Sequence, residues 1–387
     1  MTIVLFLIIL GALIFVHELG HFISAKRAGI RVDEFALGFP PKLLSKKIGE
    51  TVYSLNLVPF GGYVKIFGED AEDADKRGLE TRINADGEGR EDADSRGLET
   101  QIHADKERQF TSKPRWVQAL VLASGVLGNI VFAWLLISIS FVSGIPSSVE
   151  GRYAKEVRDS KLMITSVLPD SPAARAGLKA GDAILSLQEG TRRFEKTGGE
   201  SARQFIGETE EKLTVRYRRG EETETVEVTP IGGIVVGKPA IGVTLDTVGV
   251  VRFGFFRSFY EGAFMTWDLL REVTVGLLGF IKQAVLGEAD LASITGPVGI
   301  AGLVGEARVL GIIYLLSFTA FISINLAVIN LLPIPALDGG RLLFLAIEGV
   351  VRRPIPARIT RALNTVGFVL LILLMVVITF RDILKMI

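Results

Sequence analysis

The sequence predicts a polytopic α-helical membrane protein with four transmembrane helices, a membrane-associated β-hairpin and one extracytoplasmic α+β domain. Three observations support this fold class. Hydrophobic residues make up 49% of the 387-residue chain, and the mean hydropathy is +0.40. Four nearly uncharged runs are close to or longer than the roughly 20 residues that a helix needs to cross a bilayer. Between the second and third runs, short β-type segments alternate with turn and charge clusters.

The four apolar runs define the predicted transmembrane helices. Polar chemistry interrupts the first run only at His17, Glu18 and His21. A cleaved signal peptide is the alternative for this run, but the run lacks a basic n-region and a small-residue cleavage site. The predicted helices are 1–25, 116–149, 309–340 with the sequence LDGG at its end, and a fourth that follows a basic loop within 341–387.

The basic residues predict the orientation of these helices. Lys and Arg are concentrated after the first helix and between the third and fourth helices, and such loops face the cytoplasm. Both termini and the 150–248 segment are therefore expected outside the cytoplasm. The segment 249–308 has apolar positions at helical spacing but no uncharged run long enough to span. It predicts an interfacial amphipathic region, with a buried helix of the outer domain as the alternative.

The cytoplasmic loop 26–115 contains two unusual segments. Residues 51–67 are rich in β-branched and aromatic types and carry Gly61 and Gly62 in the middle, which predicts a β-hairpin or a looped strand pair. The segment 72–105 is a charged insert in which EDADKRGLETRINAD recurs as EDADSRGLETQIHAD, with 12 of 15 positions matching. This local duplication has no periodic core, so we expect a solvated loop and a surface position for its His103.

Composition narrows the chemistry that the chain can perform. Basic and acidic side chains each number 43, so the net charge is zero and no nucleic-acid partner is expected. The chain has no cysteine, so a tightly held transition metal must use histidine and carboxylate ligands.

In the sequence HELGH, His17 and His21 project from one helical face, and Glu18 lies close enough to activate water. Ionisable groups inside a membrane helix usually mark a functional site.

A third protein ligand is needed if one coordination position is to stay open for water. Asp338 is the best candidate, because it follows Pro333 and Pro335 in a segment that cannot continue a regular helix. The alternatives are that the two histidines only hydrogen-bond to neighbouring helices and that Asp338 is an interfacial cap. A metal site with the ligands His17, His21 and Asp338 explains why all three residues are present. It predicts Zn²⁺ as the cofactor.

HELGH, the later NLVPFGGYVK and NLLPIPALDGG resemble the site-2 protease family of intramembrane zinc metalloproteases, most closely its bacterial regulator-of-sigma-E protease branch. The resemblance implies His17, His21 and Asp338 as zinc ligands and Glu18 as catalytic base. It implies that segment 51–67 is a re-entrant β-structure that holds the substrate as an added strand. By the same resemblance, substrate-binding residues are expected at Gly61, Gly62, Asn129, Asn325 and Asn330.

Two further segments bear on this resemblance. The family typically has a Gly-Pro pair before the asparagine of helix two, whereas this chain reads SGVLGN, so Val126 stands in place of the proline. In the outer segment, VLPDSPAARAGLKAGDAILSLQEG resembles the PDZ modules of bacterial envelope proteases. A PDZ-like fold beside a groove can accept a peptide as an extra strand. The 150–248 segment is therefore expected to be one PDZ-like domain, with a peptide ligand as a further partner.

The leading hypothesis is an intramembrane zinc metalloendopeptidase of the bacterial cytoplasmic (inner) membrane. Its expected partners are the lipid bilayer and single-span membrane substrates, such as anti-sigma factors or signal-peptide remnants. The alternative is a non-catalytic, zinc-stabilised PDZ membrane scaffold, but a structural zinc site does not need Glu18. A zinc transporter is a third hypothesis. It predicts further ionisable residues inside the other three helices, and their uncharged runs contain none.

Overall fold

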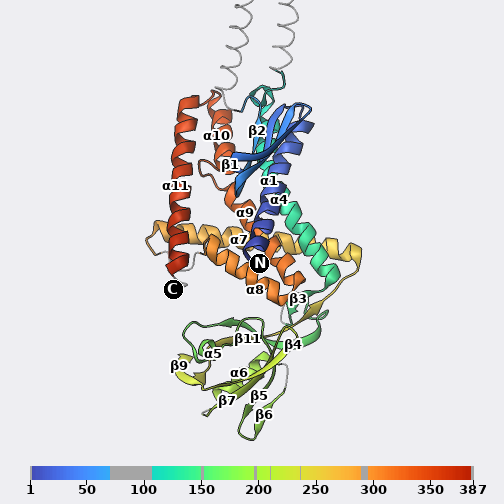
Figure 1. Ribbon diagram of the computed structural model, residues 1–387, viewed down its shortest axis with the longest axis vertical. Coiled ribbons are helices and arrows are strands. Elements are labelled where there is room, and N and C mark those ends of the chain that lie inside the picture. The colour runs from blue at the N-terminus through green and yellow to red at the C-terminus, as the bar shows by residue number, and fades with distance from the viewer. Residues whose placement is uncertain are drawn as a thin grey trace, which may run out of the picture. The chain divides into compact units, whose positions relative to one another are not determined.

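A computed structural model describes residues 2–69, 107–149, 152–195, 198–209, 211–235, 237–288 and 295–384 (Figure 1). The chain forms two compact units. The duplicated 72–105 insert, with His103, lies outside the described residues. The first unit comprises Met1–Leu136, Ala263–Gly305 and Phe318–Ile387, and the second comprises Ile137–Gly262 and Glu306–Ser317.

Four helices of the described chain are long and apolar enough to cross a membrane. They form over the uncharged runs because a helix satisfies every backbone polar group internally, as a bilayer requires. These helices are α1 (Thr2–Arg27), α4 (Arg115–Ser143), α9 (Ile312–Leu331) and α11 (Ala357–Leu384).

Two of these helices are shorter than the sequence predicted. Helix α4 ends at Ser143, before the limit of 149, because Gly144 takes a φ of +110° and β3 (Ile145–Ser148) follows. The predicted helix 309–340 is broken at both ends. Gly311, with a φ of +116°, separates α8 (Pro297–Leu310) from α9, and α9 ends at Leu331. Its continuation is interrupted by prolines, and α10 (Asp338–Val351) then begins at the end of the predicted helix and extends into the expected loop.

The structure also corrects the predicted 51–67 hairpin. Residues 51–66 form one strand, β2 (Thr51–Ile66), and its partner is β1 (Val32–Ile48). Phe35 pairs with both Val64 and Tyr53, so the first half of β1 lies between the two ends of β2. The sequence hid this strand because β1 contains Pro40, Pro41 and several lysines. The short η1 (Phe110–Ser112) packs its buried Phe110 in the core below this sheet, with Ile30 and Ile66.

The predicted amphipathic region 249–308 contains one long helix, α7 (Phe255–Val285), followed by α8. Large apolar side chains such as Phe256 and Trp267 are exposed on α7. This surface is compatible with a lipid interface.

The second unit contains a seven-stranded sheet in the order β3-β11-β4-β5-β7-β8, with β6 paired to β5. A separate two-stranded sheet joins β9 to β10. The bounds are β4 (Arg158–Val167), β5 (Ala183–Glu189), β6 (Arg192–Phe194), β7 (Leu213–Arg219), β8 (Glu222–Val228), β9 (Ile231–Val235), β10 (Lys238–Ala240) and β11 (Val243–Val251), with helices α5 (Pro172–Arg175) and α6 (Gly199–Gly207).

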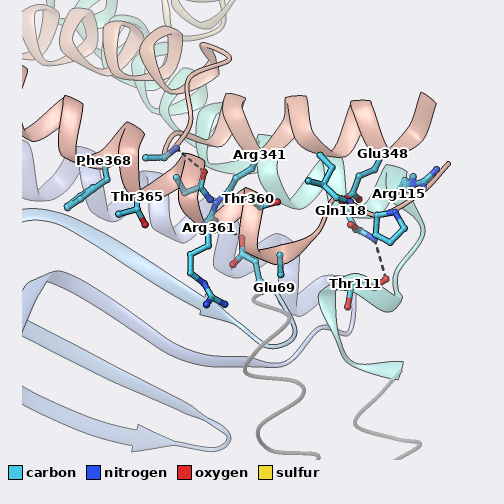
Figure 2. Close-up of a pocket in the computed structure, with 15 residues that line it drawn as sticks. Glu69, Thr111, Arg115, Gln118, Arg341, Glu348, Thr360, Arg361, Thr365 and Phe368 are labelled. Atoms are coloured by element: carbon cyan, nitrogen blue, oxygen red, sulfur yellow. Dashed lines mark hydrogen bonds and ion pairs between the residues drawn. The ribbon is translucent and has the colours of Figure 1, made fainter. Parts of the chain in front are cut away.

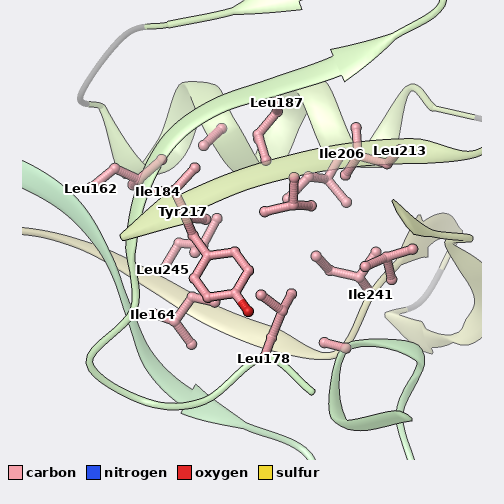
Figure 3. Packing of buried hydrophobic residues seen from close by; sticks show 14 of the residues in the cluster. Leu162, Ile164, Leu178, Ile184, Leu187, Ile206, Leu213, Tyr217, Ile241 and Leu245 are labelled. Carbon is pink, nitrogen blue, oxygen red and sulfur yellow. The ribbon is translucent and has the colours of Figure 1, made fainter. Parts of the chain in front are cut away.

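The core of this unit is apolar and continuous (Figure 3). It forms because alternate residues of the strands face inward, so that Leu213, Val215 and Tyr217 of β7 are all buried. Helix α5 begins where the Ser171 hydroxyl accepts a hydrogen bond from the Ala174 amide at 3.2 Å, with Pro172 in the first turn. The chain thus places a short helix over the SPAARAGL sequence.

Candidate metal centre

Three side chains converge in the first unit. Helix α1 presents His17 and His21 on one face, and Asp338 lies at the start of α10. The Nε2 atoms of the two histidines are 3.4 Å apart. They lie 3.1 Å and 3.3 Å from Oδ2 of Asp338. The histidines are 9% and 7% exposed, so the three groups meet in the protein interior.

These separations fit a tetrahedral zinc ion. With zinc–ligand bonds of roughly 2.0–2.1 Å, neighbouring ligand atoms in a tetrahedron lie about 3.3–3.4 Å apart. The observed separations of 3.1, 3.3 and 3.4 Å match this spacing. Oδ2 of Asp338 is buried and makes no hydrogen bond. A buried carboxylate oxygen is costly to leave unsatisfied, so the donor set has the chemistry of a cation site.

Helix α4 orients both imidazoles from behind. Nδ1 of His21 donates to the Val121 carbonyl at 2.8 Å, which leaves Nε2 free to act as a ligand. Nδ1 of His17 lies 3.3 Å from the Asn129 amide nitrogen, while Oδ1 of Asn129 is buried without a partner. Rotating this amide by 180° lets Oδ1 accept from His17 Nδ1–H and removes the unsatisfied oxygen. Asn129 thus fits a positioning role for His17.

Glycines allow this close approach of α1 and α4. A Cβ at Gly125 would lie 2.3 Å from Nε2 of His21, and one at Gly20 would lie 2.2 Å from the Ser124 carbonyl oxygen. Any larger residue would displace the histidine or separate the helices. The chain at Val126 remains helical, so the valine in place of the family's proline leaves α4 continuous here.

Glu18 shares a cavity of about 390 Å³ with the three converging residues. Gly61 and Gly62 of β2 also line it, and Gly62 is tightly packed because a Cβ there would lie 3.0 Å from Cγ of Glu18. The last part of β2, through Tyr63 and Val64, continues along the same wall. The structure therefore places the expected base, the expected metal ligands and one end of the strand pair around one space.

The structure separates the three predicted asparagines. Asn330 lines the cavity. Asn129 lies behind His17, and the amide nitrogen of Asn325 donates to the Phe321 carbonyl one turn earlier at 2.8 Å. Asn325 is half-buried and is not among the residues that line this cavity.

Sequence reasoning missed two charged residues of the site. Arg341 and Glu69 line the cavity and form an ion pair with each other. Together with Ala336 they also line a second cavity of about 860 Å³. Figure 2 shows Glu69, Arg341 and Arg361 among the side chains that line this larger space. The position of Arg341 directly after LDGG was the available signal, whereas nothing in the sequence singled out Glu69.

Known proteins resemble this chain over nearly its whole length. Residues 5–374 match the family model described as Peptidase family M50. The regulator of sigma-W protease RasP of Bacillus subtilis is 34% identical, with 99% of this chain and 98% of the relative covered. The zinc metalloprotease RasP of Geobacillus kaustophilus is 33% identical over the same shares, and a putative zinc metalloprotease of Clostridium perfringens is 34% identical. The chain therefore belongs to peptidase family M50, the site-2 protease family, and is an intramembrane zinc metalloprotease.

Proposed function

We propose that this protease holds zinc through His17, His21 and Asp338 and uses Glu18 as its general base. The observation that carries this assignment is the spacing of the three ligand atoms, with Glu18 lining the same cavity. Zinc bound here supplies Lewis-acid activation of the scissile carbonyl and of the attacking water. Glu18 accepts the proton of that water and passes it to the amine that leaves.

We infer that the substrate binds as a strand beside the last part of β2. A helical substrate hides each scissile carbonyl in an i to i−4 hydrogen bond, so it must unwind before attack. The segment Gly62–Ile66 pairs on one side with β1, and residues of this segment line the cavity of the proposed ligands. An extended substrate on the cavity side would continue the sheet and present its carbonyl to Glu18.

Proline substitution tests the strand model. Adjacent residues of a strand donate their amides in opposite directions, so one of Tyr63→Pro and Val64→Pro removes a donor on the cavity side. We expect that variant to lose cleavage by at least tenfold while its zinc content is unchanged. Lys46→Pro, on the exposed part of β1, is the matched control and should cleave normally. If both β2 variants cleave like the control, strand addition is wrong.

The substrates we propose are single-span membrane proteins, such as anti-sigma factors or signal-peptide remnants. Support comes from the name of the Bacillus subtilis relative, regulator of sigma-W protease. The basic residues after α1 and between α10 and α11 favour a bacterial cytoplasmic membrane orientation with both termini and the second unit outside. A reporter active only outside the cytoplasm, inserted after Gly190, tests this orientation. An inactive reporter in a fusion protein that is made in full would contradict it.

We propose that the second unit is a PDZ-like domain whose groove lies between α6 and β11. A cavity of about 640 Å³ is lined by both elements and by β10. Arg203 of α6 donates to the Leu245 carbonyl of β11 at 2.9 Å, so that acceptor is already occupied. This leaves the start of β11 for an extended peptide. Binding of peptides to the full-length protein, lost when Val243 is replaced by proline, would distinguish this role from a steric one.

Glu18→Gln tests the catalytic assignment. The amide cannot accept a proton, so we expect cleavage of a single-span substrate to fall by about 10²–10⁴-fold. Zinc per chain should remain at the wild-type value because Glu18 is not among the three converging ligand groups. Glu306→Gln changes an exposed glutamate of α8 and is the matched control. Zinc loss in Glu18→Gln, or wild-type cleavage, would overturn the assigned role.

A further inference from the structure

A second face of α1 borders a groove that the catalytic centre does not use. The groove lies between α1 and α4 and has a volume of about 810 Å³. Its walls are apolar and lie within the first unit, with Ile23 on α1 and Leu120, Leu127 and Val131 on α4 all exposed. The two helices meet closely at its floor, where Gly20 packs against the Ser124 backbone. The groove is therefore a cleft along two candidate membrane spans.

One end of this groove is cationic. Arg27, in the last turn of α1, and Lys113, just before α4, both line it. Neither side chain has an ion-pair or hydrogen-bond partner among the residues that the structure describes. The side-chain nitrogen of Lys113 lies near Gly29, where a Cβ would be 3.7 Å away, so both cations lie around the end of α1. Trp116, which is 70% exposed, also lines this end.

We propose that this groove binds an anionic phospholipid, with an acyl chain between α1 and α4 and the phosphate between Arg27 and Lys113. The charge pattern selects this occupant, because an apolar transmembrane helix or a second copy would leave two cations without a counter-charge. Basic pockets between membrane helices on the cytoplasmic side are suited to anionic headgroups. The exposed Trp116 has the amphipathic ring that favours the headgroup level.

The site lies directly behind the metal centre. Val121 lines the groove, while its carbonyl accepts the hydrogen bond from His21. Val16 and Gly128 line the groove as well, next to His17 and Asn129 in the chain. A bound lipid would thus support the packing of α1 on α4 at the turns that carry the proposed ligands.

Quenching of Trp116 fluorescence measures lipid binding without an activity assay. The chain has three tryptophans, so Trp134→Phe and Trp267→Phe leave Trp116 as the single reporter. The protein is placed in phosphatidylcholine vesicles that contain ten mole per cent of either brominated phosphatidylglycerol or brominated phosphatidylcholine. We expect phosphatidylglycerol to quench well above the level that its mole fraction gives, and phosphatidylcholine to quench at that level.

Charge removal decides between specific and bulk lipid. Arg27→Gln with Lys113→Gln should lower the preference for phosphatidylglycerol by on the order of 30-fold, which is about 1 kcal/mol for each cation. Arg353→Gln with Arg358→Gln removes equal charge from exposed positions outside the groove and should keep the preference. Equal quenching by both lipids overturns the proposal, as does a preference that survives in the first double variant.

A second copy in the groove would also overturn the proposal. It would shield Trp116 from both brominated lipids and give a dimer on cross-linking. Wild-type zinc content in the double variant shows that the protein is folded. Because no step of this test measures cleavage, its failure is distinguishable from failure of the proposed catalytic roles.

Discussion

Asp182 of the second unit and Asp338 of the first unit are carboxylates that are satisfied in different ways. Asp182 of the second unit is 1% exposed, and Arg219 donates to its Oδ1 and Oδ2 at 2.7 Å each. The Lys179 amide donates to Oδ2 at 2.9 Å. In the first unit, Oδ2 of Asp338 has no hydrogen-bond partner among the described residues and lies 3.1 Å and 3.3 Å from two imidazole nitrogens.

This difference distinguishes a structural carboxylate from the proposed metal ligand. Burial alone does not mark function, because Asp182, at 1% exposed, is more deeply buried than His17 and His21, at 9% and 7%. Hydrogen bonds and a guanidinium compensate Asp182 within the protein. In the proposed metal centre the two imidazoles are neutral ligands, so a bound cation compensates Asp338. The same substitution at the two positions should therefore fail in different ways.

The largest effect is expected for Asp338→Asn. A neutral amide cannot supply the negative charge that the cation needs, and the chain has no cysteine to replace it. We expect zinc to be lost on dialysis against a weak chelator, together with cleavage, and excess zinc to restore part of the activity. His21→Ala should lose zinc in the same way. Full zinc in Asp338→Asn after dialysis would exclude Asp338 as third ligand and direct attention to Asn330.

A smaller effect, on stability alone, is expected for Asp182→Asn. This change leaves the Arg219 guanidinium without its counter-charge, which costs about 2–4 kcal/mol since Arg219 is partly solvent-exposed. Hydrogen exchange in β5 and β7 of the full-length protein should rise accordingly. Zinc content after the same dialysis should equal the wild-type value. Zinc loss in this variant would show that the two carboxylates are not independent, and the comparison would fail.

The contrast between the two units also explains what the sequence could predict. His17 and His21 were recognisable because helical spacing alone brings their side chains to one face. The bounds of the β-structure could not be recognised from the sequence, because Phe35 pairs with both Val64 and Tyr53 through contacts that no local pattern encodes. The ion pair between Arg341 and Glu69 joins residues 272 positions apart. The role of Asn129 depended on which neighbour its amide meets, which only packing decides.

The second unit shows the same division between local and distant features. Its short strands and turns could be predicted from the sequence, and the SPAARAGL sequence forms a short helix capped by Ser171. Its buried polar contacts could not be predicted from the sequence, because Asp182 and Arg219 lie 37 positions apart. Spacing within one element is thus predictable from sequence, whereas satisfaction of a buried group depends on distant partners.

The smallest effect at neutral pH is expected for Tyr217→Phe, which sharpens the view of the second unit as structurally self-sufficient. Tyr217 is 3% exposed, and its hydroxyl donates to Glu224. Burial, and then the Glu224 carboxylate, raises the pKa of Tyr217 to about 12. Losing this hydrogen bond should cost about 1 kcal/mol near pH 7.

The alkaline range separates Tyr217→Phe from wild type more clearly. An unfolded tyrosine has a pKa of about 10, so below that pH the phenol is protonated in both states and its contribution is fully present. Between about pH 10 and the folded pKa of about 12, only the unfolded state releases the proton, and wild-type stability falls as pH rises. Tyr217→Phe lacks this proton release, so its stability should decline less steeply over that window.

Tyr260→Phe changes an exposed ring and should keep the wild-type slope. Hydrogen exchange of β7 and β8, followed from pH 8 to 11 in the three proteins, measures the slopes. If stability falls equally steeply with pH in wild type and Tyr217→Phe, Tyr217 has the same pKa in the folded and unfolded states. The buried phenol would then not be stabilised in its protonated form by the second unit.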